Sequence, residues 1–83
     1  MTTRAQNEIK FKNWDVRPGG GRIYHLDVYG RWGWRTRYCQ DVDALEATLR
    51  FWQEIYDDKG NLVEVHDKYP VDYRTPESVR YLT

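Results

Sequence analysis

The first apolar residues of the chain alternate with polar ones. Ile9 and Phe11 stand between charged residues in the segment 8–16, which is the two-residue period of a half-buried strand. The next apolar residues fall on the opposite parity, and a β-bulge near Asn13 would return them to the same face. We therefore predict a first strand over residues 8–16, followed by a turn at the glycine-rich residues 17–21.

Residues 22–29 and 33–40 are two runs rich in β-branched and aromatic residues, separated by a short segment that contains glycine. This pattern predicts a β-hairpin. A two-residue loop would mix arginines into the apolar face, whereas a three-residue loop at Gly30–Trp32, with a glycine free to take a positive φ, keeps that face apolar. The three-residue loop predicts these pairs: Val28 with Trp34, Leu26 with Thr36, and Tyr24 with Tyr38.

The same register places opposite charges across the other face of the hairpin. Asp27 lies opposite Arg35, and His25 lies opposite Arg37. A cross-strand ion pair of this kind contributes roughly 0.2–1 kcal/mol. We therefore expect Asp27 to hold Arg35.

The segment 44–56 has the apolar spacing of a helix. Asp43 and Glu46 form a capping-box pattern at its start, and apolar residues then recur at intervals of four, three and four. We predict a helix over residues 44–56 whose apolar face is formed by Leu45, Leu49, Trp52 and Tyr56, with Thr48 and Ile55 beside them.

A second interpretation ends this helix near Arg50. Residues 51–56 are then a strand, joined to another strand at 62–66 by a turn at 57–61. The two acidic residues at positions 57 and 58 fit the end of a helix poorly, because the helix dipole favours cations there. The helix remains our preferred interpretation.

The last part of the chain predicts one more strand and a short helical turn. The segment 62–66 alternates between apolar and polar residues. Pro70 ends the pairing, and Thr75 caps a final helical turn whose Val79 and Leu82 can dock on the rest of the protein.

Together these elements predict a single α+β domain over residues 1–83. The expected architecture is an antiparallel sheet of about four strands in the order β-β-β-α-β, with the main helix packed on one face and a short C-terminal helical turn. Residues 1–7 are expected to be disordered, and residues 70–83 to form an irregular tail. A chain of 83 residues has room for one hydrophobic core and no second domain.

Cysteine content and hydropathy indicate the environment. Cys39 is the sole cysteine, so no intramolecular disulfide can form, whereas a small secreted domain normally contains several. The N-terminal residues are polar, and no stretch of about 18 apolar residues that could span a membrane occurs. We therefore expect a cytoplasmic protein that does not bind a membrane.

Charge is balanced overall but not along the chain. Thirteen basic and thirteen acidic side chains cancel, which removes the simplest argument for a nucleic-acid or membrane-binding protein. Residues 1–40 carry eight basic and three acidic side chains, whereas residues 41–83 carry five and ten. The two halves therefore have net charges of +5 and −5, which can orient the molecule on a charged partner or on a second copy of itself.

The basic, aromatic hairpin is the first candidate site. Exposed aromatic side chains stack on unpaired bases and arginines contact phosphates, so a β surface with both types can bind single-stranded RNA. The predicted register, however, places Trp34 and Tyr38 in the core. The candidate binding surface consists of Tyr29, Arg31, Trp32, Arg35 and Arg37.

Acidic side chains provide a second candidate surface. They cluster around the predicted helix and its C-terminal end, where they can receive a basic partner. An exposed edge strand, at residues 9–14 or 62–66, would also allow pairing with another chain. The candidate partner surface consists of Glu46, Glu54, Asp57 and Asp58.

The sequence predicts no cofactor, metal or phosphate site. The glycine-rich segment 18–22 offers backbone amides beside an arginine, but it lacks the lysine and the following helix of a phosphate loop, so we interpret it as a linker. The candidate metal ligands have no chelating spacing. They are His25, Asp27, Cys39, His66 and Asp67.

Catalytic residues are equally sparse. Cys39 lies in a predicted strand without a base fixed beside it, and we interpret it as a small core residue. The segment His66–Tyr69 contains residue types that small toxin-like ribonucleases use for acid–base catalysis. It belongs to the acidic half of the chain, however, which suits a polyanionic substrate poorly.

The leading hypothesis is therefore a non-catalytic interaction module that binds a protein partner or itself. The alternative is single-stranded nucleic-acid binding through the hairpin at residues 30–38, and a toxin-like ribonuclease is the third candidate. No family resemblance contributes to these hypotheses, which depend on the residues alone.

Overall fold

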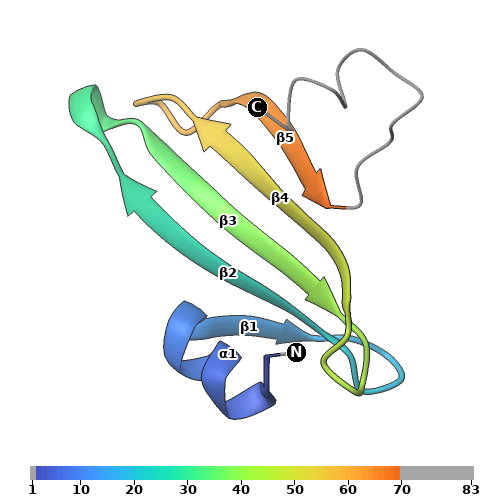
Figure 1. Cartoon of the computed structure of the whole chain (residues 1–83). Coiled ribbons are helices and arrows are strands. Elements are labelled where there is room, and N and C mark those ends of the chain that lie inside the picture. The colour runs from blue at the N-terminus through green and yellow to red at the C-terminus, as the bar shows by residue number, and fades with distance from the viewer. Residues whose placement is uncertain (1, 70–83) are drawn as a thin grey trace.

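Residues 2–69 are described by a computed structural model of the chain. They form a five-stranded antiparallel sheet in which each strand pairs with the next along the chain, in the order β1-β2-β3-β4-β5 (Figure 1). One short helix precedes the sheet. The elements are α1 (Arg4–Phe11), β1 (Asn13–Val16), β2 (Arg22–Tyr29), the 3-10 turn η1 (Arg31–Gly33), β3 (Arg35–Val42), β4 (Thr48–Tyr56) and β5 (Leu62–Tyr69).

This architecture corrects the predicted fold class. The expected four-stranded sheet with a main helix on one face is wrong, because the segment predicted as that helix is largely strand β4 and the α-helix of the described residues is short and N-terminal. The helical turn expected at Thr75 and the irregular tail 70–83 lie outside the described residues. Within residues 2–69 no helix is long and apolar enough to cross a membrane.

α1 replaces the first part of the strand predicted over residues 8–16. The hydroxyl of Thr3 accepts a hydrogen bond from the N–H of Gln6 (3.2 Å), and the Gln6 side chain accepts one from the N–H of Thr3 (2.9 Å). This capping box starts the helix within the segment 1–7, which the sequence indicated as disordered. The helix ends at Lys12, which adopts a left-handed conformation with φ 69°.

β4 confirms the second interpretation of residues 51–56 and overturns the helix predicted over 44–56. Asp43 does not cap a helix, because its carboxylate accepts hydrogen bonds from the N–H groups of Leu45 (2.9 Å) and Ala47 (3.0 Å) within the β3–β4 turn. β4 lies between two other strands and packs side chains on both faces of the sheet. Its apolar residues are therefore not confined to one parity, and they imitate a helical spacing.

The β2–β3 hairpin has a three-residue loop, but at Arg31–Gly33 instead of the predicted Gly30–Trp32. Gly33 takes the positive φ (77°), whereas Gly30 has φ −104°. The N–H of Gly30 donates to the carbonyl oxygen of Trp34 (2.8 Å) and closes the loop. The predicted register is therefore wrong by two residues, which keeps each side chain on its predicted face. The observed pairs are Val28 with Thr36, Leu26 with Tyr38, and Tyr24 with Gln40.

All four connections between the described strands close with the same hydrogen bond. In each, the N–H of the first residue donates to the carbonyl oxygen of the fifth, and the fourth residue is left-handed. Glycine is favoured at such a position because it has no Cβ, and Glu46 is the exception. The turns are 17–21, 30–34, 43–47 and 57–61, with left-handed residues Gly20 (φ 91°), Gly33 (φ 77°), Glu46 (φ 65°) and Gly60 (φ 81°) at the fourth position.

The hydrophobic core lies between α1 and one face of the sheet, at the end of the sheet where β2 begins and β3 ends (Figure 1). Phe11 stacks on Tyr24 with their ring centroids 5.5 Å apart, and both are buried with Val42. Partly buried side chains, Trp14, Leu26 and Phe51, pack against this cluster. The other face of the sheet carries no helix within residues 2–69, so its side chains pair with one another instead.

Candidate interaction surface

Glu46, in the β3–β4 turn, directs its carboxylate into the core beneath α1. Its side chain is 7% exposed and accepts hydrogen bonds from Arg4 Nε (2.7 Å), Asn7 Nδ2 (2.9 Å) and the Tyr24 hydroxyl (2.8 Å). Burial alone would raise the pKa of Glu46, but these three hydrogen bonds outweigh it and hold the pKa below its ordinary value. Glu46 therefore ties α1 to the sheet and does not belong to an accessible acidic surface.

Asp27 binds both arginines that follow the hairpin loop. Its carboxylate accepts hydrogen bonds from Arg37 Nε (2.7 Å) and Nη2 (3.1 Å) and from Arg35 Nη1 (3.0 Å). The hydrogen bond from Arg37 holds the pKa of Asp27 below its ordinary value. The expected contact between Asp27 and Arg35 is present, but it is diagonal, because Arg37 lies directly opposite Asp27. Both of these partly exposed arginines are thus held in ion pairs within the molecule.

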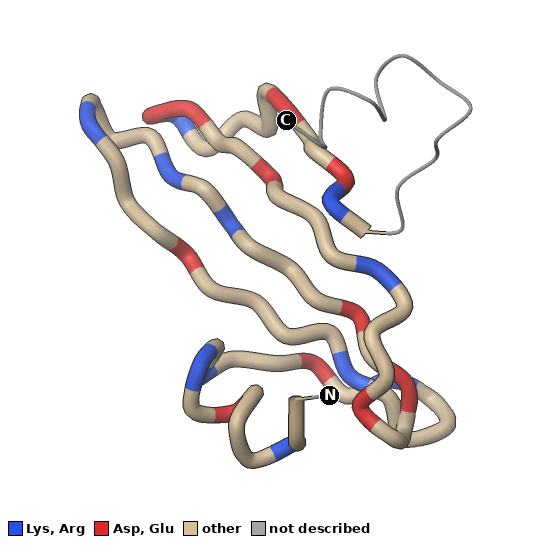
Figure 2. Tube along the Cα trace, in the orientation of Figure 1, with Lys and Arg blue, Asp and Glu red and all other residues tan. Residues whose placement is uncertain are grey.

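Glu54 lies on the opposite side of β3 from Asp27 and is the direct neighbour of Arg37 on β4. Figure 2 shows acidic residues of β2 and β4 on either side of the basic residues of β3. Glu54 accepts hydrogen bonds from Trp52 Nε1 (3.0 Å) and the Tyr56 hydroxyl (2.7 Å). Burial would raise the pKa of Glu54, but these donors lower it below its ordinary value. Like Glu46, this carboxylate is committed to contacts within the chain.

Cys39 lies in the middle of the same face, opposite Trp52 on β4. Its side chain is 3% exposed, and burial raises the pKa of the Cys39 thiol to about 12. A thiol needs to ionise to act as a nucleophile. Cys39 is therefore a core residue of the sheet.

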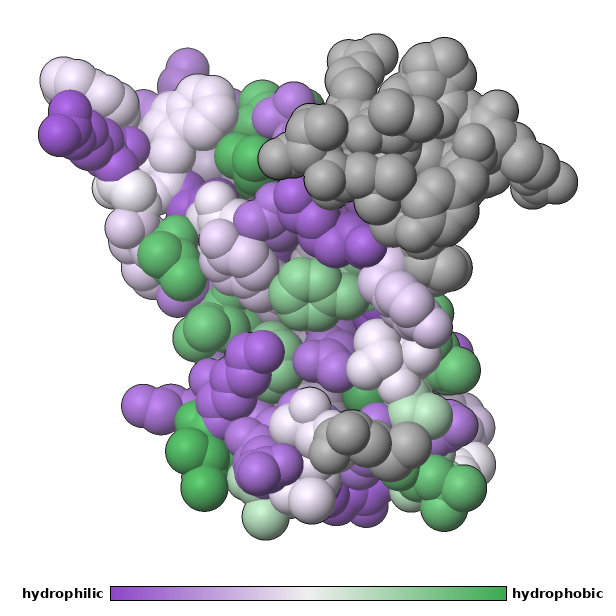
Figure 3. All heavy atoms as spheres, viewed as in Figure 1, coloured by the Kyte–Doolittle hydropathy of each residue, from purple (hydrophilic) through white to green (hydrophobic). Residues whose placement is uncertain are grey.

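Tyr29, Arg31 and Trp32 form the free end of the β2–β3 hairpin, which we call the aromatic tip. Trp32 is 85% exposed and Tyr29 is 73% exposed. Arg31 is also exposed, and its guanidinium has no hydrogen bond or ion pair with the described residues. The tip projects from the rest of the molecule at the upper left of Figure 3. It unites three of the five residues of the predicted binding surface.

The backbone of Trp32 is left-handed, with φ 64° and ψ 21°. This conformation costs about 1–2 kcal/mol for a residue other than glycine. Because the side chain is exposed, packing against residues 2–69 offsets little of that cost. The fold alone would favour glycine at position 32.

Asp57 and Asp58 lie beside the aromatic tip. A Cβ placed on Gly33 would lie 3.2 Å from the Cβ of Asp58, so the hairpin loop and the β4–β5 turn approach closely. The Asp57 carboxylate accepts hydrogen bonds from the N–H groups of its own turn. The predicted acidic surface is therefore divided: Glu46 lies at the other end of β3, Glu54 on the sheet face, and Asp57 and Asp58 at the tip.

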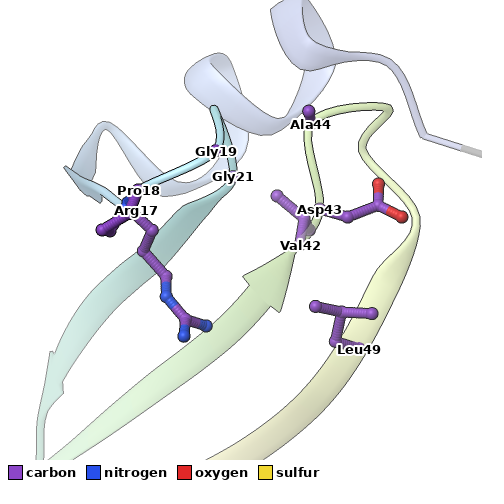
Figure 4. A pocket seen from close by; sticks show the side chains of 8 residues that line it. All are labelled: Arg17, Pro18, Gly19, Gly21, Val42, Asp43, Ala44 and Leu49. Carbon is purple, nitrogen blue, oxygen red and sulfur yellow. The ribbon is translucent and has the colours of Figure 1, made fainter.

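The glycine-rich loop after β1 lines a hollow of about 200 Å³ (Figure 4). The Arg17 guanidinium pairs with Asp41, and the Asp43 carboxylate accepts hydrogen bonds within its own turn. Arg22 turns towards α1, where it binds Glu8 (2.6 Å). No unpaired cation therefore faces the hollow among its described lining residues, which are Arg17, Pro18, Gly19, Gly21, Val42, Asp43, Ala44 and Leu49.

The candidate metal and ribonuclease residues do not converge. Within residues 2–69 no three His, Cys, Asp or Glu side chains come together as a metal site. His66 lies 3.2 Å from Glu64, whereas the next residue, Asp67, points to the opposite face and binds Arg50 Nε (2.7 Å). The predicted catalytic segment is therefore divided between the two faces of the sheet.

Sequence reasoning missed the burial of Glu46. An aspartate that accepts hydrogen bonds from the following N–H groups is common to helix caps and tight turns, so Asp43 fitted both. The aspartate that begins both 43–47 and 57–61 was the available signal for a turn at the first segment, since it accepts the same hydrogen bonds in both, but nothing local indicates that Glu46 is buried.

Comparison of the chain with protein-family models, curated proteins and solved structures finds no match.

Proposed function

We propose that the protein is a non-catalytic interaction module that binds a protein partner through the aromatic tip. The observation that carries this proposal is Trp32, which is almost fully exposed and left-handed although the fold favours glycine there. Backbone strain of this kind clusters at functional sites. Trp, Tyr and Arg, the three residue types of the tip, are also those enriched among the residues that dominate protein–protein binding energies.

A protein partner suits the tip better than a nucleic acid does. Arg35 and Arg37 both form ion pairs with Asp27, and Asp58 lies beside the tip. Phosphate binding depends on a surplus of cations, and the whole chain has none. Exposed aromatic groups with a single arginine and an acidic rim instead match the centre and border of a protein interface.

Replacement of Trp32 by glycine separates binding from folding. Partners are captured with the full-length chain and their affinities measured with purified proteins. We expect Trp32→Gly to weaken binding at least about 30-fold, equivalent to the roughly 2 kcal/mol of an anchoring residue, without loss of thermal stability. Leu45→Gly is the matched control and should bind like the wild type, because Leu45 is 81% exposed in the β3–β4 turn, away from the tip.

Two results would contradict the proposal. A partner bound equally well by Trp32→Gly and by the wild type would place the site elsewhere. Amide chemical shifts at residues 29–38 that change with a single-stranded RNA pool, and return to their free values on addition of salt, would assign the tip to nucleic acid.

A further inference from the structure

β5 forms an edge of the sheet, and within residues 2–69 no strand lies on its outer side. Backbone groups of alternate residues on an antiparallel strand point to opposite sides. The β4–β5 turn closes with a hydrogen bond from the N–H of Asp57 to the carbonyl of Asn61 (3.0 Å), and counting along the paired strands makes Glu64 and His66 the residues that face β4. Val65, between them, points its N–H and carbonyl outward.

Several apolar side chains of β5 are exposed. Val65 is 43% exposed, and Leu62 and Val63 are about half exposed. Proteins usually shorten or cover an edge strand, because its unpaired N–H and C=O groups recruit other strands. The opposite edge follows that rule, since β1 has only four residues. β5 has eight residues and is therefore the edge suited to strand addition.

We infer that a second copy of this chain pairs with β5, antiparallel to it, with Val65 at the two-fold axis. The two copies of Val65 then exchange both of their outward backbone hydrogen bonds. Glu64 lies opposite the partner's His66, and His66 lies opposite the partner's Glu64. The two five-stranded sheets become one continuous sheet.

Charge selects this register over its neighbours. Pairing centred on Glu64 or on Asp67 would place two identical carboxylates directly opposite each other, which is destabilising. Pairing centred on His66 would bring two imidazoles together. Pairing centred on Val65 avoids this repulsion, because it places each Glu64 carboxylate opposite an imidazole of the partner, and it is centred in the regular part of the strand, because the irregularities in the β4–β5 register lie outside residues 64–67.

The whole molecule is compatible with this association. Its net charge is zero, so two copies do not repel each other over a distance. The aromatic tip lies beside the β4–β5 turn, at the Leu62 end of β5. Antiparallel pairing therefore places the two tips at opposite ends of the joined sheet, where both remain accessible.

Sedimentation equilibrium of the full-length chain tests the pairing. We expect the wild type to have the mass of two chains and Val65→Pro the mass of one, because proline lacks the outward N–H while the bonds to β4 are kept. Val65→Thr is the matched control, which keeps the N–H and the β-branched shape and should remain dimeric. A wild-type chain that sediments as a single chain at every concentration overturns the inference.

Exchange of charges tests the register without proline. His66→Glu should raise the dimer dissociation constant about tenfold, because it places two carboxylates opposite each other twice, and Glu64→Lys should also raise it, because it removes the carboxylate that faces the partner's imidazole twice. The double variant should recover the wild-type constant, since lysine then faces glutamate. A double variant that dimerises more weakly than both single variants contradicts this register.

Hydrogen exchange provides a measurement that needs no substitution. The amide of Val65 should exchange slowly in concentrated protein and at least about tenfold faster on dilution, as the outward hydrogen bond is lost. The amides of Glu64 and His66, which face β4, should not change. Protection of Val65 that is independent of concentration overturns the inference. Because the tip and β5 are separate, Trp32→Gly should remain dimeric whichever way the tip experiment turns out.

Discussion

Glu46 and Trp32 are two of the three non-glycine residues with a positive φ within residues 2–69, and the third, Lys12, ends helix α1. Both are left-handed, and both are in loops where glycine would cost less. The carboxylate of Glu46 offsets its cost inside the molecule, since hydrogen bonds to charged groups contribute about 1.5–3 kcal/mol each. Trp32 has no comparable contact within residues 2–69. We therefore assign Glu46 a role in stability and Trp32 a role in binding.

Removal of the Glu46 side chain tests its role in attaching α1. We expect Glu46→Gly to lower the free energy of unfolding by about 2–3 kcal/mol, although it relieves the strained φ, because Arg4, Asn7 and Tyr24 lose their acceptor. Urea denaturation followed by tryptophan fluorescence measures the change. Glu46→Gln should lose less, since it keeps an acceptor. Equal stability of Glu46→Gly and the wild type would refute the role.

The thiol of Cys39 should be unreactive in the folded protein. It is buried with a raised pKa, so thiolate is scarce near neutral pH. We expect alkylation by iodoacetamide at pH 8 to be at least about 100-fold slower in the native protein than in urea. Comparable rates in the two states would show that the Cys39 thiol is reactive in the folded protein and would make it a candidate nucleophile.

At the scale of the elements, loop geometry decided the hairpin register. The sequence offers glycine at positions 30 and 33, and either could supply a positive φ. Both choices keep the apolar residues of β2 and β3 on one face, so the hydrophobic pattern does not distinguish them. The approach of the β4–β5 turn to Gly33, a contact between segments distant in sequence, accompanies the loop that forms.

Two alanine substitutions distinguish the two loops. Gly33→Ala should lower the free energy of unfolding by about 1–2 kcal/mol, because φ is 77° and the new Cβ would lie 3.2 Å from Asp58. Gly30→Ala is the matched control, with φ −104° and its nearest neighbour at 3.7 Å, and should change stability by less than about 0.5 kcal/mol. Thermal or urea unfolding gives both values, and the opposite ranking would favour the loop at Gly30–Trp32.

At the scale of the whole molecule, hydrogen-bonded carboxylates contribute to stability alongside the small hydrophobic core. The helix covers only one end of one sheet face, and carboxylates on both faces are held by hydrogen-bond donors from neighbouring elements. Burial is limited in a chain of this length, so such contacts form a larger share of its stability than in a large domain. Stability should therefore depend on pH at both extremes.

The direction of that dependence follows from the pKa shifts. The lowered pKa values of Asp27, Glu46 and Glu54 contribute stability that is present above the ordinary carboxyl range, about pH 4, and is lost as pH falls through their folded values. Burial and the hydrogen bond to Glu46 raise the pKa of Tyr24, which contributes stability below about pH 10 that is lost as pH rises towards its folded value. Urea unfolding at a series of pH values should show a plateau between these limits. Glu46→Gln should lose less stability on acidification than the wild type, and an equal acid loss would contradict the assignment.

The sequence by itself determined the hairpin, the face on which Tyr24 and Leu26 lie, and the contact of Asp27 with Arg35, because alternation along paired strands depends only on neighbouring positions. It also singled out Tyr29, Arg31 and Trp32 as a candidate surface. Tertiary structure decided that residues 48–56 are a strand, since an aspartate followed by irregularly spaced apolar residues satisfies both a capped helix and a turn leading into an interior strand. It also decided which charges are available: Glu46 is buried because α1 folds over its turn, and Arg37 lies directly opposite Asp27 because β2 and β3 pair in the observed register. These choices depend on contacts between segments distant in the chain, which no local pattern encodes.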